Sequence, residues 1–216
     1  MLPVPIPWPG GRRAPVRLKE MGVREILDQP GGPILSGLVR LLVMNALSTR
    51  FLKPSFYRVV YDVDTLDLID LGNAGRIGMV GAFFPFLRRL KAIPGIDLSV
   101  IERKPESLKE DGMRFYIPAH RAGDVLPRCD TVIITGASMA NGTIDELLGY
   151  TRPGARVVVT GPTASMRPDV LFEKNVTVVS GVHVTDPDLA LDMLSEAVTA
   201  YHLFDTCMRK INVLKG

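Results

Sequence analysis

From Arg76 onward, short apolar runs with strand character alternate with helical segments, and this alternation restricts the chain to few folds. Strands are expected at 77–80, 97–101, 131–135, 155–160 and 176–180. Such alternation is typical of a parallel sheet whose two faces are both covered by helices. Right-handed crossovers then bring the carboxyl ends of these strands to one edge of the sheet. The sequence therefore predicts an α/β fold, a Rossmann-like and mostly parallel sheet, at 71–216.

Helices are expected between these strands and after them. The segments 84–92 and 144–149 follow strands and have helical character. The last segment, 188–210, carries apolar residues at helical spacing and is predicted to be one long closing helix. Its apolar face is expected to pack mainly on the sheet. The same apolar residues are also compatible with a homo-oligomer.

The first part of the chain lacks this rhythm. Residues 1 to about 15 are rich in proline and glycine and are expected to be extended on the surface. Helices are predicted at 20–28 and 35–47, the second because apolar residues recur every three or four positions. The region 50–71 is interpreted as a connection that includes another short helix around 64–70. We therefore predict a small α+β segment at 1–70, before the Rossmann-like domain.

Composition excludes several classes of protein. The 216 residues are 46% hydrophobic and 23% charged, which is ordinary for a chain that buries a core. The net charge is only +3 and the basic residues are scattered, so no nucleic-acid partner is expected. Two cysteines are too few for a disulfide framework. With no signal peptide and no long apolar stretch, the sequence predicts a cytoplasmic protein without a membrane partner.

The first glycine-ended strand carries Gly78 and Gly81, and glycine allows a tight turn and close approach to a ligand. Ligands of open parallel sheets sit beyond the carboxyl ends of the strands. Glu102 ends the next strand, about 20 residues later, where a dinucleotide fold places an acid on a ribose hydroxyl. However, the complete glycine fingerprint is absent, and Phe83 and Phe84 stand where a pyrophosphate needs room. A tight turn packed by phenylalanine is the alternative.

The second glycine-ended strand, 131–135, is followed by the segment Asn141-Gly142-Thr143. Thr143 and Glu146 have the spacing of a capping box. The same helix start offers backbone N–H groups to an anion. Asn141 serves either the turn or a ligand, and the sequence does not decide between them.

Two residues are candidates for proton transfer or metal contact. Asp145 lies in the first turn of the helix after this loop, and His183 follows the strand at 176–180. Histidine changes its charge near neutral pH and is a common metal ligand. An ordinary polar loop residue is the alternative for His183. No metal ion is assigned, since Cys129 precedes its strand and Cys207 lies on the closing helix, both away from the expected cleft.

The residues that we predict to contact a cofactor or other ligand share a position at the carboxyl ends of strands. They are Gly78, Gly81, Phe84, Pro85, Glu102, Thr135, Gly136, Asn141, Gly142, Thr143, Gly161, Pro162 and Thr163.

Several of these segments resemble the DUF364 family, which carries a heavy-metal chelation label. The resemblance covers roughly residues 70 to 186, and its most specific part is the Asn-Gly-Thr segment at 141–143 after a strand that ends in Thr-Gly. It implies a Rossmann-like domain joined to a domain similar to the N-terminal part of enolases, with the functional site in the cleft between them. Residues 1–70 would then be a shortened form of that first domain.

These observations predict a small-molecule-binding protein whose ligand is polar and either metal-chelating or nucleotide-like. The cofactor candidates are a metal chelate, S-adenosylmethionine and NAD(P). The alternatives are an enzyme that uses NAD(P) or S-adenosylmethionine, and a sensor without turnover. Glu102 supports either cofactor, whereas the missing fingerprint disfavours NAD(P).

Overall fold

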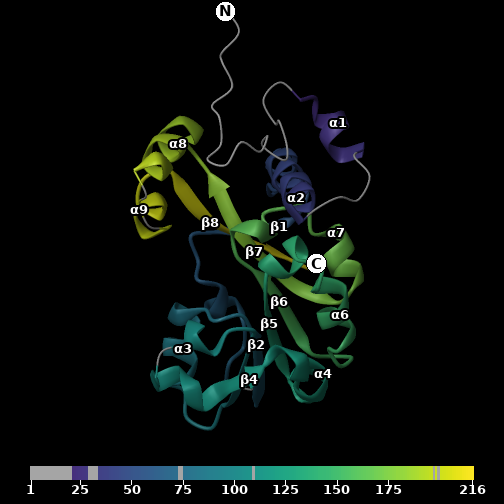
Figure 1. Ribbon diagram of the computed structural model, residues 1–216, viewed down its shortest axis with the longest axis vertical. Helices are drawn as coiled ribbons and strands as arrows, with labels where there is room; N and C mark the ends of the chain where they lie inside the picture. Colours follow the sequence, from purple (N-terminus) through teal and green to yellow (C-terminus); the bar gives the residue numbers. More distant parts are fainter. Residues whose placement is uncertain (1–20, 29–33, 73–74, 109, 197, 199) are drawn as a thin grey trace, which may run out of the picture.

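The computed structural model describes residues 21–28, 34–72, 75–108, 110–196, 198 and 200–216 (Figure 1). Within these residues the strands form one mixed sheet of eight, in the order β1-β8-β7-β6-β5-β2-β3-β4. Strands β2 to β7 pair in parallel, and β8 runs antiparallel to both of its neighbours. The strands are β1 (Arg58–Tyr61), β2 (Arg76–Val80), β3 (Asp97–Glu102), β4 (Tyr116–Pro118), β5 (Thr131–Thr135), β6 (Arg156–Thr160), β7 (Val176–Val184) and β8 (Met208–Leu214).

Helices cover both faces of this sheet, as the sequence predicts. The α-helices are α1 (Val23–Asp28), α2 (Ile34–Ser48), α3 (Phe84–Leu90), α4 (Ala122–Val125), α5 (Ala137–Ala140), α6 (Ile144–Gly149), α7 (Asp169–Glu173), α8 (Pro187–Ser195) and α9 (Ala200–Phe204). Short 3-10 helices are η1 (Thr65–Leu68), η2 (Pro105–Ser107), η3 (Glu110–Phe115), η4 (Ala119–Arg121), η5 (Leu126–Arg128) and η6 (Pro162–Ala164).

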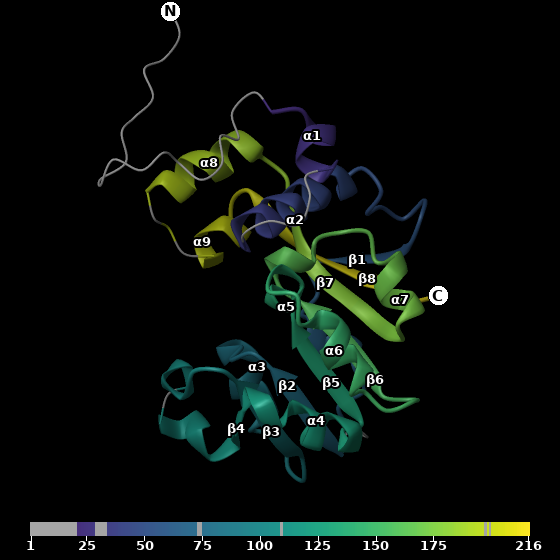
Figure 2. The same cartoon turned by 45° about the vertical axis from the view of Figure 1, so that its right-hand side comes forward.

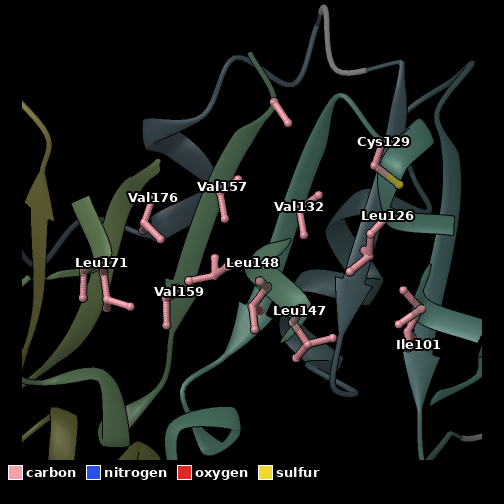
Figure 3. Close-up of a cluster of buried hydrophobic side chains, with 14 of the residues drawn as sticks. Ile101, Leu126, Cys129, Val132, Leu147, Leu148, Val157, Val159, Leu171 and Val176 are labelled. Carbon is pink, nitrogen blue, oxygen red and sulfur yellow. The ribbon is translucent and has the colours of Figure 1, made fainter. Parts of the chain in front are cut away.

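Alternation along the strands divides the core into two layers. In β5, Ile133 packs on the face that α3 covers, whereas Val132 and Ile134 pack on the opposite face. Helices α4, α6 and α7 lie on that opposite face, where Leu147 and Leu148 of α6 join the cluster shown in Figure 3. Because both faces are buried, the middle residues of the central strands are mostly apolar. The predicted mostly parallel sheet is confirmed.

The prediction of one long closing helix at 188–210 is wrong. The chain forms α8 and α9 there, and then enters the sheet as β8 between β1 and β7. Ile211, Asn212 and Val213 are all buried, because a central strand has neighbours on both faces. The region 50–71 likewise contains β1, a strand that the sequence pattern did not predict.

The N-terminal segment contributes to the same sheet, because β1 pairs with β8. Helix α2 lies beside the loop after β6, where the Asn45 side chain donates a hydrogen bond to the Thr163 carbonyl at 3.1 Å (Figure 2). The Ser48 hydroxyl also accepts a hydrogen bond from the Arg167 amide at 3.0 Å. The boundary near residue 70 stays a prediction, and the extended stretch expected at 1–15 lies outside the described residues.

In the part of the chain that the structure describes, no helix is both long and apolar enough to cross a membrane. Helix α8 buries Ala190 but leaves Leu189, Leu191 and Leu194 exposed. The predicted packing of this face on the sheet is therefore incomplete, and a homo-oligomer stays a prediction.

Candidate functional site

A cavity of about 390 Å³ lies at the carboxyl ends of the parallel strands. The loops after β2, β3, β4 and β5 line it, together with α6 and the start of α4. Its polar lining side chains are Glu102, Arg103, His120, Thr135, Ser138, Asn141, Thr143, Glu146 and Tyr150. A second cavity, of about 510 Å³, touches Arg76 and Asp97, the first residues of β2 and β3. We take the smaller cavity as the candidate site because ligands of such sheets bind at the carboxyl ends.

The turn after β2 brings the backbone close to β5. Gly81 has a φ of 97°, which favours glycine, and its amide donates to the Ile101 carbonyl at 3.0 Å. A Cβ atom at this position would lie 3.1 Å from the Thr135 Cβ atom. The Phe83 amide then donates a hydrogen bond to the Gly81 carbonyl at 3.1 Å. Glycine here therefore allows the ends of β2 and β5 to meet beside the cavity.

Glu102 is held by backbone groups at the end of β3. One carboxylate oxygen accepts from the Ala82 amide at 3.1 Å, and the other from the Arg103 amide at 2.7 Å and the Lys104 amide at 3.4 Å. These backbone bonds orient the carboxylate. Since a carboxylate offers about four acceptor positions, Glu102 keeps acceptor capacity for a ligand.

The loop after β5 is built differently from the prediction. Asn141 Oδ1 accepts from the Thr143 amide at 3.1 Å and from the Thr143 hydroxyl at 2.7 Å. The predicted capping box is wrong, because the Thr143 side chain makes no cap and Glu146 bonds to Tyr150 instead. Gly142 allows the turn with a φ of 76°. Asn141 Oδ1 thus serves the turn, while its Nδ2 group stays available at the cavity wall.

Tyr150 and Glu146 form a pair that the sequence reasoning missed. The Tyr150 hydroxyl donates to a Glu146 carboxylate oxygen at 2.6 Å. This hydrogen bond, assisted by desolvation, raises the pKa of Tyr150. A Cβ atom at Gly123 of α4 would lie 3.2 Å from the Tyr150 ring, so this glycine lets α4 approach the phenol closely. The four-residue spacing on one helix was the available signal.

The two predicted proton-transfer residues do not line the cavity. Asp145 is exposed and forms an ion pair with Lys174 at 2.9 Å. His183 lies within β7, opposite Arg209 of β8, and makes an edge contact with the Tyr61 ring at 6.2 Å. Their roles stay predictions.

The other predicted residues divide between the cavity and its surroundings. Gly81, Glu102, Thr135, Asn141 and Thr143 line the cavity. Gly78 faces the core. Phe84 is 44% exposed, and Pro85 lies in the first turn of α3. Gly136, Gly161, Pro162 and Thr163 lie where the β5 and β6 loops meet η6, beside α2.

The described residues do not offer a donor set that suits a heavy metal. They contain no group of three or more histidine, cysteine, aspartate or glutamate side chains placed to hold an ion. Soft metals favour thiolate ligands. Cys129 and Cys207 are both buried, in different clusters, and burial raises the pKa of Cys129 to about 11. The Cys129 thiol is therefore protonated at neutral pH.

The family model labelled DUF364 and described as "Putative heavy-metal chelation" matches residues 64–213. The chain belongs to the DUF364 family. A DUF364 protein of unknown function from Pyrococcus horikoshii shares the fold, with a TM-score of 0.79 and 23% identity over 94% of this chain and 79% of that chain. A second DUF364 structure of unknown function, from Desulfitobacterium hafniense DCB-2, has a TM-score of 0.66 and 27% identity, covering 84% of this chain and 69% of that one.

A curated relative of this DUF364 protein is an uncharacterized protein of Methanocaldococcus jannaschii. The two chains are 31% identical over 107 residues, which cover 50% of this chain and 40% of the relative. The chain thus matches less than half of that relative's length.

Proposed function

We propose that this DUF364 protein binds a nucleoside-like small molecule in the cavity at the carboxyl ends of β2, β3 and β5. The observation that carries the proposal is the position of Glu102, a backbone-held carboxylate with spare acceptor capacity at the end of β3. A carboxylate with one acceptor position left at this point of a Rossmann-like sheet suits a ribose hydroxyl group.

The rest of the cavity supports a ligand with a flat ring. Phe83 and Tyr150 contribute aromatic side chains to the lining, and Ile101 and Leu147 add apolar surface. The cavity volume of about 390 Å³ falls in the range of small-molecule sites. A metal chelator that carries hydroxyl groups would make the same hydrogen bond to Glu102 and is the second candidate ligand.

The first test is the variant Glu102→Gln with adenosine and S-adenosylmethionine as probes. Affinity for a bound probe is expected to fall about 10- to 100-fold, because a hydrogen bond to a charged group contributes about 1.5–3 kcal/mol. Isothermal titration calorimetry measures the affinity, and circular dichroism verifies folding. Glu106→Gln, on an exposed residue of η2, is the matched control and should bind normally. Unchanged affinity in Glu102→Gln, or no binding of either probe to the natural chain at millimolar concentration, would contradict the proposal.

A further inference from the structure

The loop after β2, residues 81–83, keeps its backbone amides occupied and so offers none of them to a phosphate. Dinucleotide folds bind the diphosphate with the amides of this loop and of the helix that follows. Here the amides of Gly81, Ala82 and Phe83 all donate to acceptors within the protein, at 3.0, 3.1 and 3.1 Å. Pro85, in the first turn of α3, has no N–H group. A phosphate at this loop would therefore find no free amide at residues 81–83 and none at Pro85.

Two hydroxyl groups of the cavity lining also donate their hydrogen bonds within the protein. The Tyr150 hydroxyl donates to Glu146, and the Thr143 hydroxyl donates to Asn141. What these hydroxyls present to the cavity is acceptor capacity. The Thr143 amide is likewise occupied, since it donates to the Ser138 carbonyl at 2.9 Å.

The charges of the lining point in the same direction. Two carboxylates, Glu102 and Glu146, accept only. Among the described residues that line the cavity, Arg103 is the one side chain with a fixed positive charge, and both Arg103 and Glu146 are exposed. The donors of the lining side chains are the Arg103 guanidinium, Asn141 Nδ2, the Thr135 hydroxyl and the His120 ring. With two carboxylates and one guanidinium, the lining complements a ligand that carries a positive charge and donor groups.

We infer that the cavity selects a ligand bearing hydroxyl and ammonium groups and discriminates against phosphate, with Glu146 as a specificity-determining residue. Gly123 allows α4 to pack against the Tyr150 ring, and the ring hydroxyl holds one oxygen of the Glu146 carboxylate by a hydrogen bond. The inference rests on the proposed nucleoside-like ligand. It favours a cationic nucleoside, the class that includes S-adenosylmethionine, over NAD(P).

The experiment compares three adenosine compounds that differ only at the 5′ position. Equilibrium dialysis measures the affinity of the full chain for adenosine, 5′-amino-5′-deoxyadenosine and AMP. These compounds are a neutral, a cationic and an anionic form of one scaffold. The amino form is expected to bind at least about tenfold more tightly than AMP, because the two carboxylates of the lining attract an ammonium group and repel a phosphate. Glu146→Gln should reduce this ratio to about threefold or less, while its amide oxygen still accepts from Tyr150. Glu173→Gln, on the exposed end of α7, is the matched control and should keep the ratio.

The outcomes separate this inference from the proposed function. Adenosine binding that depends on Glu102 supports the proposed function alone. If AMP then binds as tightly as the amino form, or if Glu146→Gln leaves the ratio unchanged, the charge selection is wrong although the site is right. If none of the three adenosine compounds binds, both proposals are wrong.

Discussion

Replacing Asn212 by alanine is expected to lower the free energy of unfolding by about 3 kcal/mol, because buried polar partners lose their hydrogen bonds. Asn212 is 1% exposed in β8 and joins both neighbouring strands. Its Oδ1 atom accepts from the Ser180 hydroxyl at 2.6 Å and from the Thr65 hydroxyl at 3.3 Å. Its Nδ2 group donates to the Val63 carbonyl at 3.0 Å. The amide therefore ties the N-terminal segment to the C-terminal strand and to β7.

Urea denaturation at about 25 °C measures this loss, and Ser180→Ala gives a graded comparison. The serine variant removes one donor and should cost about 1 kcal/mol. Asn212→Ala alone leaves the Ser180 hydroxyl without its acceptor, and the double variant lacks that hydroxyl. The loss of stability in the double variant should therefore be smaller than the sum of the single losses. Additive losses, or a loss below about 1 kcal/mol for Asn212→Ala, would show that this amide does not hold the segment to the sheet.

Replacing Gly136 by alanine is expected to destabilise the fold by about 1–3 kcal/mol through overpacking. A Cβ atom at this position would lie 2.6 Å from the Thr163 hydroxyl oxygen and 2.9 Å from the Ala164 amide nitrogen. The backbone of η6 cannot move aside without disturbing the loop on which Asn45 of α2 docks. The φ of Gly136, −58°, is ordinary, so steric contact alone produces the loss.

Gly149→Ala is the matched control for this substitution. Gly149 ends α6, and a Cβ atom at this position would meet no heavy atom of another described element within 4 Å. Alanine there should be neutral or should stabilise the chain by up to about 1 kcal/mol, because it favours helix. Thermal unfolding followed by circular dichroism compares the two variants. Equal melting temperatures for the two alanine variants would contradict the close approach between η6 and the end of β5.

Membership of the DUF364 family and the geometry of the cavity bear on different questions. The family label concerns heavy-metal chelation, whereas the described residues offer two buried thiols in separate clusters. The acceptor-rich cavity suits an organic ligand with donor groups. A role in making or recognising an organic metal chelator would reconcile the label with these residues.

The sequence by itself determined the parallel core of this protein. Strands β2, β3, β5 and β6 are short apolar runs bounded by glycine, proline or charged residues, so local pattern was sufficient to find them. Because parallel strands end at one edge, the same pattern placed Gly81, Glu102 and Asn141 beside one cavity.

Only the tertiary structure decided the two ends of the chain and the chemistry of the cavity wall. The last residues form β8 rather than helix, because β1 and β7 supply hydrogen bonds on both sides and Ser180 satisfies Asn212. The contact of Gly123 with Tyr150 and the hydrogen bonds that occupy the loop amides join residues from different elements. Such contacts depend on how distant segments pack, and no local pattern of residues encodes them.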